Sequence, residues 1–100
     1  MKTVYAKDLE LELVLLKARL EPIAKEAYVF GSAVHGAVAM ESDFDVLILP
    51  KRRLSYQRAY DETWSALVKI LARGLAPHLV IASARHDPEF IRNAKAFRIV

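Results

Sequence analysis

The chain has 100 residues, of which 54% are hydrophobic and 27% are charged, and this composition predicts one globular domain spanning residues 1–100. It contains no cysteine, which excludes disulfides, thiolate metal sites and a cysteine nucleophile. No apolar run approaches the roughly 20 residues that a membrane span needs, and the first residues lack a signal peptide's apolar region. We therefore expect a cytoplasmic protein. The formal net charge of +3 is too mild to indicate nucleic acid as a partner.

The first predicted element is a helix over residues 8–21, capped by Asp8 and followed by Pro22. Its leucines recur at helical spacing: Leu9, Leu13, Leu16 and Leu20. Because residues 9–13 also alternate between leucine and glutamate, a strand is the competing interpretation. Further apolar side chains, Leu11, Val14 and Leu15, widen the apolar arc. We favour a broad core face as their explanation over contact with a second subunit.

The rest of the chain alternates between predicted strands and helices. Apolar runs at 27–30, 45–49 and 79–82 predict buried strands. Helices are expected over 33–39, capped by Ser32, over 55–73, capped by Ser55 and ended by Gly74, and over 88–96. The long helix is expected to place these side chains on one face: Tyr60, Trp64, Leu67 and Leu71. The pattern predicts an α/β domain with three to four strands flanked by helices.

A pair of aspartates, Asp43 and Asp45, opens the second predicted strand. Being two residues apart, they are expected to project from the same face. Neighbouring carboxylates repel each other, and a divalent cation between them removes that conflict. Hard oxygen ligands favour Mg²⁺ or Mn²⁺, which complete their coordination with water and substrate phosphates. Taken alone, such a pair is more often a solvated loop than a metal site.

Gly31 and Ser32 follow the first predicted strand. A glycine allows a ligand to approach the backbone closely, and Ser32 lies where a helix N-terminus would present unpaired N–H groups to a phosphate. By itself the dipeptide is more simply a strand-to-helix turn. Together with the aspartates on what should be a neighbouring strand, it predicts the two halves of a nucleotide–metal site.

Gly31-Ser32, ten intervening residues and then Asp43-Phe44-Asp45 resemble the signature of the DNA polymerase β-like nucleotidyltransferases. The compact length resembles their minimal branch, the MNT proteins. This resemblance implies a mixed-sheet fold, ATP or another nucleoside triphosphate as donor, Mg²⁺ as cofactor and transfer of a nucleotidyl group to a hydroxyl. It implies that Asp43 and Asp45 bind the metal and that Gly31 and Ser32 hold the triphosphate. It also implies a role as an antitoxin that AMPylates a HEPN-type protein partner.

The resemblance fails at two positions. The family usually has a third carboxylate on a later strand, and the corresponding position here is His78. An imidazole can act as a base or bind a metal near neutral pH, so His78 is a candidate catalytic residue, although a histidine at a strand end is the simpler interpretation. His35 stands where the family often has an arginine. Asp87 and Glu89 follow the last predicted strand, but nothing in the sequence places them in the site.

Three functions remain open from the sequence. The first is a Mg²⁺-dependent nucleotidyltransferase. The second is a nucleotide-binding or partner-binding module of the same fold that has lost transfer with the third carboxylate. The third, which we do not favour, is nucleic-acid binding through Lys51, Arg52 and Arg53, because a charged loop is usually only solvated and no aromatic residues interleave with these bases. The sequence leaves homo-oligomerisation open and gives no reason to expect a membrane partner.

Overall fold

The computed structural model describes residues 3–5, 9–30, 37–39, 43–82 and 97–100. These residues form six strands and two helices: β1 (Thr3–Tyr5), α1 (Glu10–Leu20), β2 (Ala24–Phe30), β3 (Ala37–Ala39), β4 (Asp43–Pro50), α2 (Tyr56–Ala72), β5 (Ala76–Ile81) and β6 (Phe97–Arg98). No helix among them is long and apolar enough to cross a membrane.

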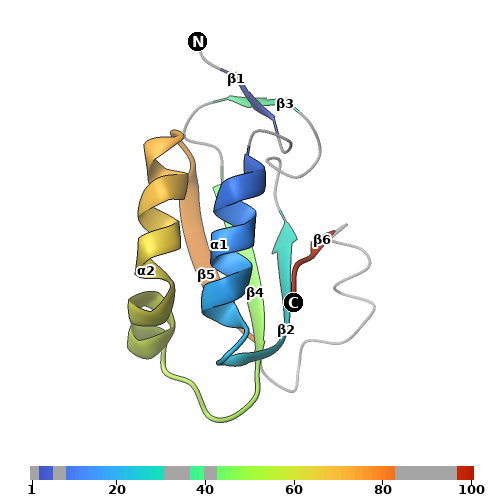
Figure 1. Cartoon of the computed structure of the whole chain (residues 1–100), viewed down its shortest axis with the longest axis vertical. Helices are drawn as coiled ribbons and strands as arrows, with labels where there is room; N and C mark the ends of the chain where they lie inside the picture. The colour runs from blue at the N-terminus through green and yellow to red at the C-terminus, as the bar shows by residue number, and fades with distance from the viewer. Residues whose placement is uncertain (1–2, 6–8, 31–36, 40–42, 83–96) are drawn as a thin grey trace.

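The main sheet has four strands in the order β5-β4-β2-β6 (Figure 1). β4 and β5 are parallel and are connected through α2, whereas β2 is antiparallel to both of its neighbours. β1 and β3 form a separate antiparallel pair, and β3 lies in the connection between β2 and β4. The predicted mixed sheet of three to four strands in an α/β fold is therefore confirmed, with β4 as an interior strand.

Both helices pack on the same face of this sheet, where they form one core with alternate residues of the strands (Figure 1). Leu16 and Leu20 of α1 and Ile70 of α2 are completely buried there. The strand residues of this core are Ala24, Ala27, Val29, Phe44, Val46, Ile48 and Leu79. In β4, Asp45 and Leu47 lie on the opposite face by the alternation of a strand, and Leu47 is buried there. The helices thus pack on one face of β4, and Asp45 lies on the other.

The first helix is confirmed, which excludes the competing strand over residues 9–13. Its N-cap is Leu9 without a side-chain hydrogen bond, so the predicted cap by Asp8 is wrong. Leu11 and Val14 are 79% and 62% exposed. The broad core face is therefore also wrong for these two residues, because they lie on the side of α1 that points away from the sheet. Contact with a second subunit stays a prediction.

Two other predicted helices have different outcomes. Of the helix expected over 33–39, residues 37–39 form β3 instead, paired with β1 in the register Thr3 with Ala39 and Tyr5 with Ala37. A long-range strand partner here outweighs the weak helical preference of a segment that contains a glycine. The helix expected over 88–96 lies outside the described residues.

The long helix α2 begins and ends as predicted. The Ser55 hydroxyl accepts a hydrogen bond from the Arg58 N–H at 3.2 Å, and Gly74 adopts the left-handed φ of 87° that ends a helix. The predicted apolar face is wrong in part, since Trp64 and Leu71 are 56% and 47% exposed. The buried face consists of Ala59, Thr63, Ala66, Leu67 and Ile70. Small residues on this face bring α2 close to the sheet.

An ion pair joins the two helices. Arg73, just past the end of α2, donates from its Nε to the Glu12 Oε1 of α1 at 2.9 Å. Glu12 is only 7% exposed, and its Oε2 has no hydrogen-bond partner. Burying a carboxylate is costly without a cationic partner, so Arg73 makes the burial of Glu12 tolerable.

The free edge of the sheet at β5 is covered by tyrosine hydroxyls. The Ala82 N–H bonds to the Ile48 carbonyl of β4, so the amides of Leu79 and Ile81 point to the other side, toward the free edge. The Leu79 N–H donates to the Tyr60 hydroxyl and the Ile81 N–H to the Tyr56 hydroxyl, both at 3.1 Å. Since exposed edges promote pairing with other chains, these contacts protect β5.

We expect Tyr60→Phe to lower the free energy of unfolding by about 1 kcal/mol, because it leaves the partly buried Leu79 N–H without an acceptor. Tyr56→Phe is the matched control, since its hydrogen bond is exposed and water can replace the hydroxyl. Urea denaturation of both variants measures the difference. Equal losses in the two variants would contradict a protective role specific to Tyr60.

Candidate functional site

The face of the sheet opposite to the helices aligns three residues at one level. In the strand register, Asp45 of β4 lies beside Phe30 of β2 on one side and beside His78 of β5 on the other. Neighbouring strands are about 4.8 Å apart, and register partners project from the same face. Asp45 is half-buried and His78 is exposed. The structure thus brings together Asp45 and His78, which are 33 positions apart in the sequence (78 − 45 = 33).

Asp43 is the first residue of β4 and lies beside Ala76 of β5. Its position is two residues before Asp45, which places it on the same face of the strand by the alternation of β-structure. The side chain of Asp43 is outside the described part of the structure. The backbone therefore agrees with the predicted arrangement of the aspartate pair.

Gly31 and Ser32, the predicted phosphate-binding residues, lie outside the described residues. The strand that leads to them ends at Phe30, in register with Asp45. The expectation that the glycine–serine turn follows a strand next to the aspartates agrees with the order β4-β2.

The position of Asp45 is fixed from the other side of the sheet. Its neighbours in the strand, Phe44 and Val46, are completely buried against the helices. Each of them anchors β4 by its side chain, so the backbone between them has little freedom. A candidate carboxylate on an interior strand, flanked by two core residues, is held rigidly enough for coordination or catalysis.

The described residues contain no group of three or more acidic, histidine or cysteine side chains that could hold a metal ion. Asp45 and the imidazole of His78 are the described members of the candidate centre, and the Asp43 carboxylate would be its third. The carboxylate oxygens of Asp43 and Asp45 are donors of the kind that suits Mg²⁺ or Mn²⁺, with the remaining coordination left to water and phosphate. The two aspartates therefore fit the predicted metal.

A comparison with protein families decides the identity of the fold. The family described as "Nucleotidyltransferase domain" matches residues 13–100 of the chain. The chain belongs to this nucleotidyltransferase family. The family is part of the polymerase β-like superfamily, as the spacing of Gly31-Ser32 and Asp43-Phe44-Asp45 indicated. No curated protein matches the chain.

Membership in the nucleotidyltransferase family identifies the chain as a member of a transferase family. The match includes β2, β4 and β5, and so every strand that borders the Asp45 level. Domains of this family generally use nucleoside triphosphates and divalent metal ions. The position expected from the resemblance to carry a third carboxylate, His78, is beside Asp45 in the register.

One residue near these features and one at the opposite end of the sheet were not identified from the sequence. Tyr28 lies on the same face as Asp45, one level further along β2, and pairs with Arg98 of β6. Its partner strand has only two residues, Phe97 and Arg98, and carries no apolar run that would reveal it. The second is Arg58, which lies near the basic loop after β4. The sequence signal for Arg58 is that it lies three residues after Ser55, the residue that caps α2, and so belongs to the first turn of that helix.

Proposed function

We propose that this nucleotidyltransferase is a Mg²⁺-dependent enzyme that transfers an adenylyl group from ATP to a hydroxyl. The observation that carries the proposal is the register that aligns Asp45 with His78 and with the end of the strand before Gly31. This alignment supports a carboxylate site next to a phosphate site, as nucleotidyl transfer requires. Family membership supports the general reaction.

In the proposed reaction, the acceptor hydroxyl oxygen forms a bond to the α-phosphorus of ATP. The bond between that phosphorus and the oxygen bridging to the β-phosphate breaks, and pyrophosphate leaves. Asp43 and Asp45 would hold the divalent ion, which supplies charge stabilisation for the phosphate oxygens. Gly31 and Ser32 would hold the triphosphate through backbone and hydroxyl donors. His78, in register with Asp45, would accept the hydroxyl proton, and the chain would otherwise contribute by orientation.

We further propose that the acceptor is a HEPN-type protein partner and that the chain acts as the antitoxin of such a pair by AMPylating it. The support for this partner is the resemblance of the Gly31–Asp45 segment to the MNT proteins. The test is incubation with α-labelled ATP, Mg²⁺ and a candidate HEPN-type protein. Label should pass to the partner with the wild type and not with an Asp43→Asn, Asp45→Asn double variant. Equal labelling by the two proteins, or labelling that persists with EDTA, contradicts the proposal.

The alternative function is a nucleotide-binding or partner-binding module without transfer. The observation that favours it is His78 at the position expected to hold a carboxylate.

If His78 is the base, we expect His78→Ala to lower the transfer rate by about 10²-fold and His78→Asp to retain most of it. Since His78 is exposed, both variants should keep the free energy of unfolding of the wild type. An inactive wild type that gains transfer on His78→Asp supports the alternative instead.

A further inference from the structure

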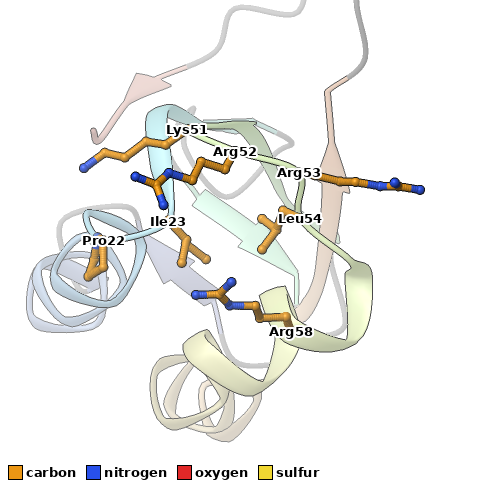
Figure 2. A pocket seen from close by; sticks show the side chains of 7 residues that line it. All are labelled: Pro22, Ile23, Lys51, Arg52, Arg53, Leu54 and Arg58. Atoms are coloured by element: carbon orange, nitrogen blue, oxygen red, sulfur yellow. The ribbon is translucent and has the colours of Figure 1, made fainter.

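A pocket of about 340 Å³ lies at the end of the main sheet opposite to Asp43 and Asp45. It is formed between the turn that connects α1 to β2 and the loop that connects β4 to α2 (Figure 2). The lining residues are Pro22, Ile23, Lys51, Arg52, Arg53, Leu54 and Arg58. Four of these seven residues are basic and none is acidic, so the pocket is a concentrated positive region on a chain of only mild net charge.

The pocket is held by contacts of the backbone. The Lys51 N–H donates to the Ile23 carbonyl at 3.1 Å and thereby ties the loop after β4 to the turn before β2. Ile23 is 6% exposed and belongs to the core, so it gives the pocket a fixed apolar wall. On the other side, the hydrogen bond from the Arg58 N–H to the Ser55 hydroxyl fixes the first turn of α2. The basic side chains are therefore attached to ordered backbone.

Two of the arginines are directed at the same space. Figure 2 shows the guanidinium groups of Arg52 and Arg58 on either side of the Ile23 side chain, whereas Arg53 points away from the others. Within the described part of the chain, Arg73 pairs with Glu12 and Arg98 with Glu26, and neither of these ion pairs involves a residue of the pocket. Guanidinium groups without a carboxylate partner in a concave surface attract an anion.

The geometry points to a ligand class: we propose that this pocket binds a small phosphate-bearing molecule, held between Arg52 and Arg58 with its remaining part against Ile23 and Leu54. The planar guanidinium fork matches phosphate oxygens. The volume is at the lower end of the range for small-molecule sites, about 300–1,000 Å³. The first turn of α2 contains no acidic residue that would oppose an anion.

A nucleic acid strand fits these observations less well. A strand needs positive charge along a line and aromatic side chains on which its bases stack. Here the cations gather around one cavity, and none of its lining residues is aromatic. The pocket is also separate from the proposed triphosphate site, since the six residue steps from Asp45 in β4 to Lys51, just after its end, span about 20 Å. Ligand binding here therefore does not depend on the proposed transfer reaction.

The test is calorimetric titration of the full chain with inorganic pyrophosphate in the presence of EDTA, which keeps divalent ions from contributing to phosphate binding at the aspartates. We expect the Arg52→Ala, Arg58→Ala double variant to bind at least about tenfold more weakly than the wild type, because two charge-assisted contacts are lost. Lys69→Ala is the control, since it removes a positive charge from an exposed position of α2 outside the pocket, and should bind within about twofold of the wild type. Unchanged affinity in the double variant overturns the proposal.

Methyl NMR locates the site independently of the variants. Addition of pyrophosphate should shift the methyl signals of Ile23 and Leu54, and shifts confined to Val80, on the Asp45 face, overturn the assignment. Parallel titrations with inorganic phosphate and AMP distinguish a free phosphate ligand from a nucleotide. A single-stranded oligonucleotide is the other candidate ligand. If it binds more tightly than pyrophosphate, and if Arg53→Ala weakens its binding as much as the Arg52→Ala, Arg58→Ala double variant does, the proposed small ligand is wrong and the pocket binds nucleic acid.

Discussion

Asp45→Asn is expected to lower the nucleotidyl transfer rate by at least about 10²–10³-fold, the range found when one group that stabilises transition-state charge is removed. Asp45 is the described carboxylate that lies in register with both His78 and the end of β2. The amide is nearly identical in shape but lacks the negative charge, so it would bind a divalent cation far more weakly. Release of labelled pyrophosphate, or transfer of label from ATP to the acceptor, measures the rate.

The matched control for this variant is Asp61→Asn, which makes the same chemical change at an exposed position on α2. It should leave the rate unchanged, because α2 packs on the covered face of the sheet. Asp45 is half-buried, and its substitution should change the free energy of unfolding little, since neither side chain enters the core. A rate within about threefold of the wild type for Asp45→Asn would remove the carboxylate site from the proposed mechanism.

The sequence predicted the features that depend on local chemistry. Buried strands show as apolar runs, so β2, β4 and β5 were found, although each extends beyond the predicted bounds. The ends of α2 were found because Ser55 and Gly74 have specific roles at helix ends. The adjacency of Asp45 and His78 could only be inferred through the family resemblance, because strand register is a long-range property.

What the sequence did not predict depends on contacts between distant segments. Trp64 and Leu71 were expected on one apolar face of α2 with Tyr60 and Leu67, but the buried face consists of Ala59, Thr63, Ala66, Leu67 and Ile70. A helix that lies close to a sheet needs small residues at the contact. A prediction of core residues from hydrophobicity alone favours large apolar side chains over such small ones. β3 was assigned to a helix because its partner strand is distant in the sequence: Thr3 of β1 pairs with Ala39 of β3, 36 positions away (39 − 3 = 36).

Phe44 connects the stability of the fold to the geometry of the site. It lies between Asp43 and Asp45 in the strand, and its side chain is completely buried in the core on the opposite face. We expect Phe44→Ala to lower the free energy of unfolding by about 3–5 kcal/mol, the usual cost of removing a buried aromatic side chain. Because a small domain has a total of about 5–15 kcal/mol, this change removes a large share of it. Urea denaturation followed by circular dichroism measures the loss.

A second variant, Phe44→Leu, separates packing from catalysis. Leucine retains most of the apolar volume, so the free energy of unfolding should fall by less than about 2 kcal/mol, and the domain should stay folded under assay conditions. If Phe44 positions the carboxylates, transfer should still decrease, since a displacement of about 1 Å at the neighbouring residues is enough to impair a reaction that depends on orientation. Transfer equal to the wild type in a folded Phe44→Leu protein would mean that β4 holds the aspartates through its hydrogen bonds to β2 and β5 alone.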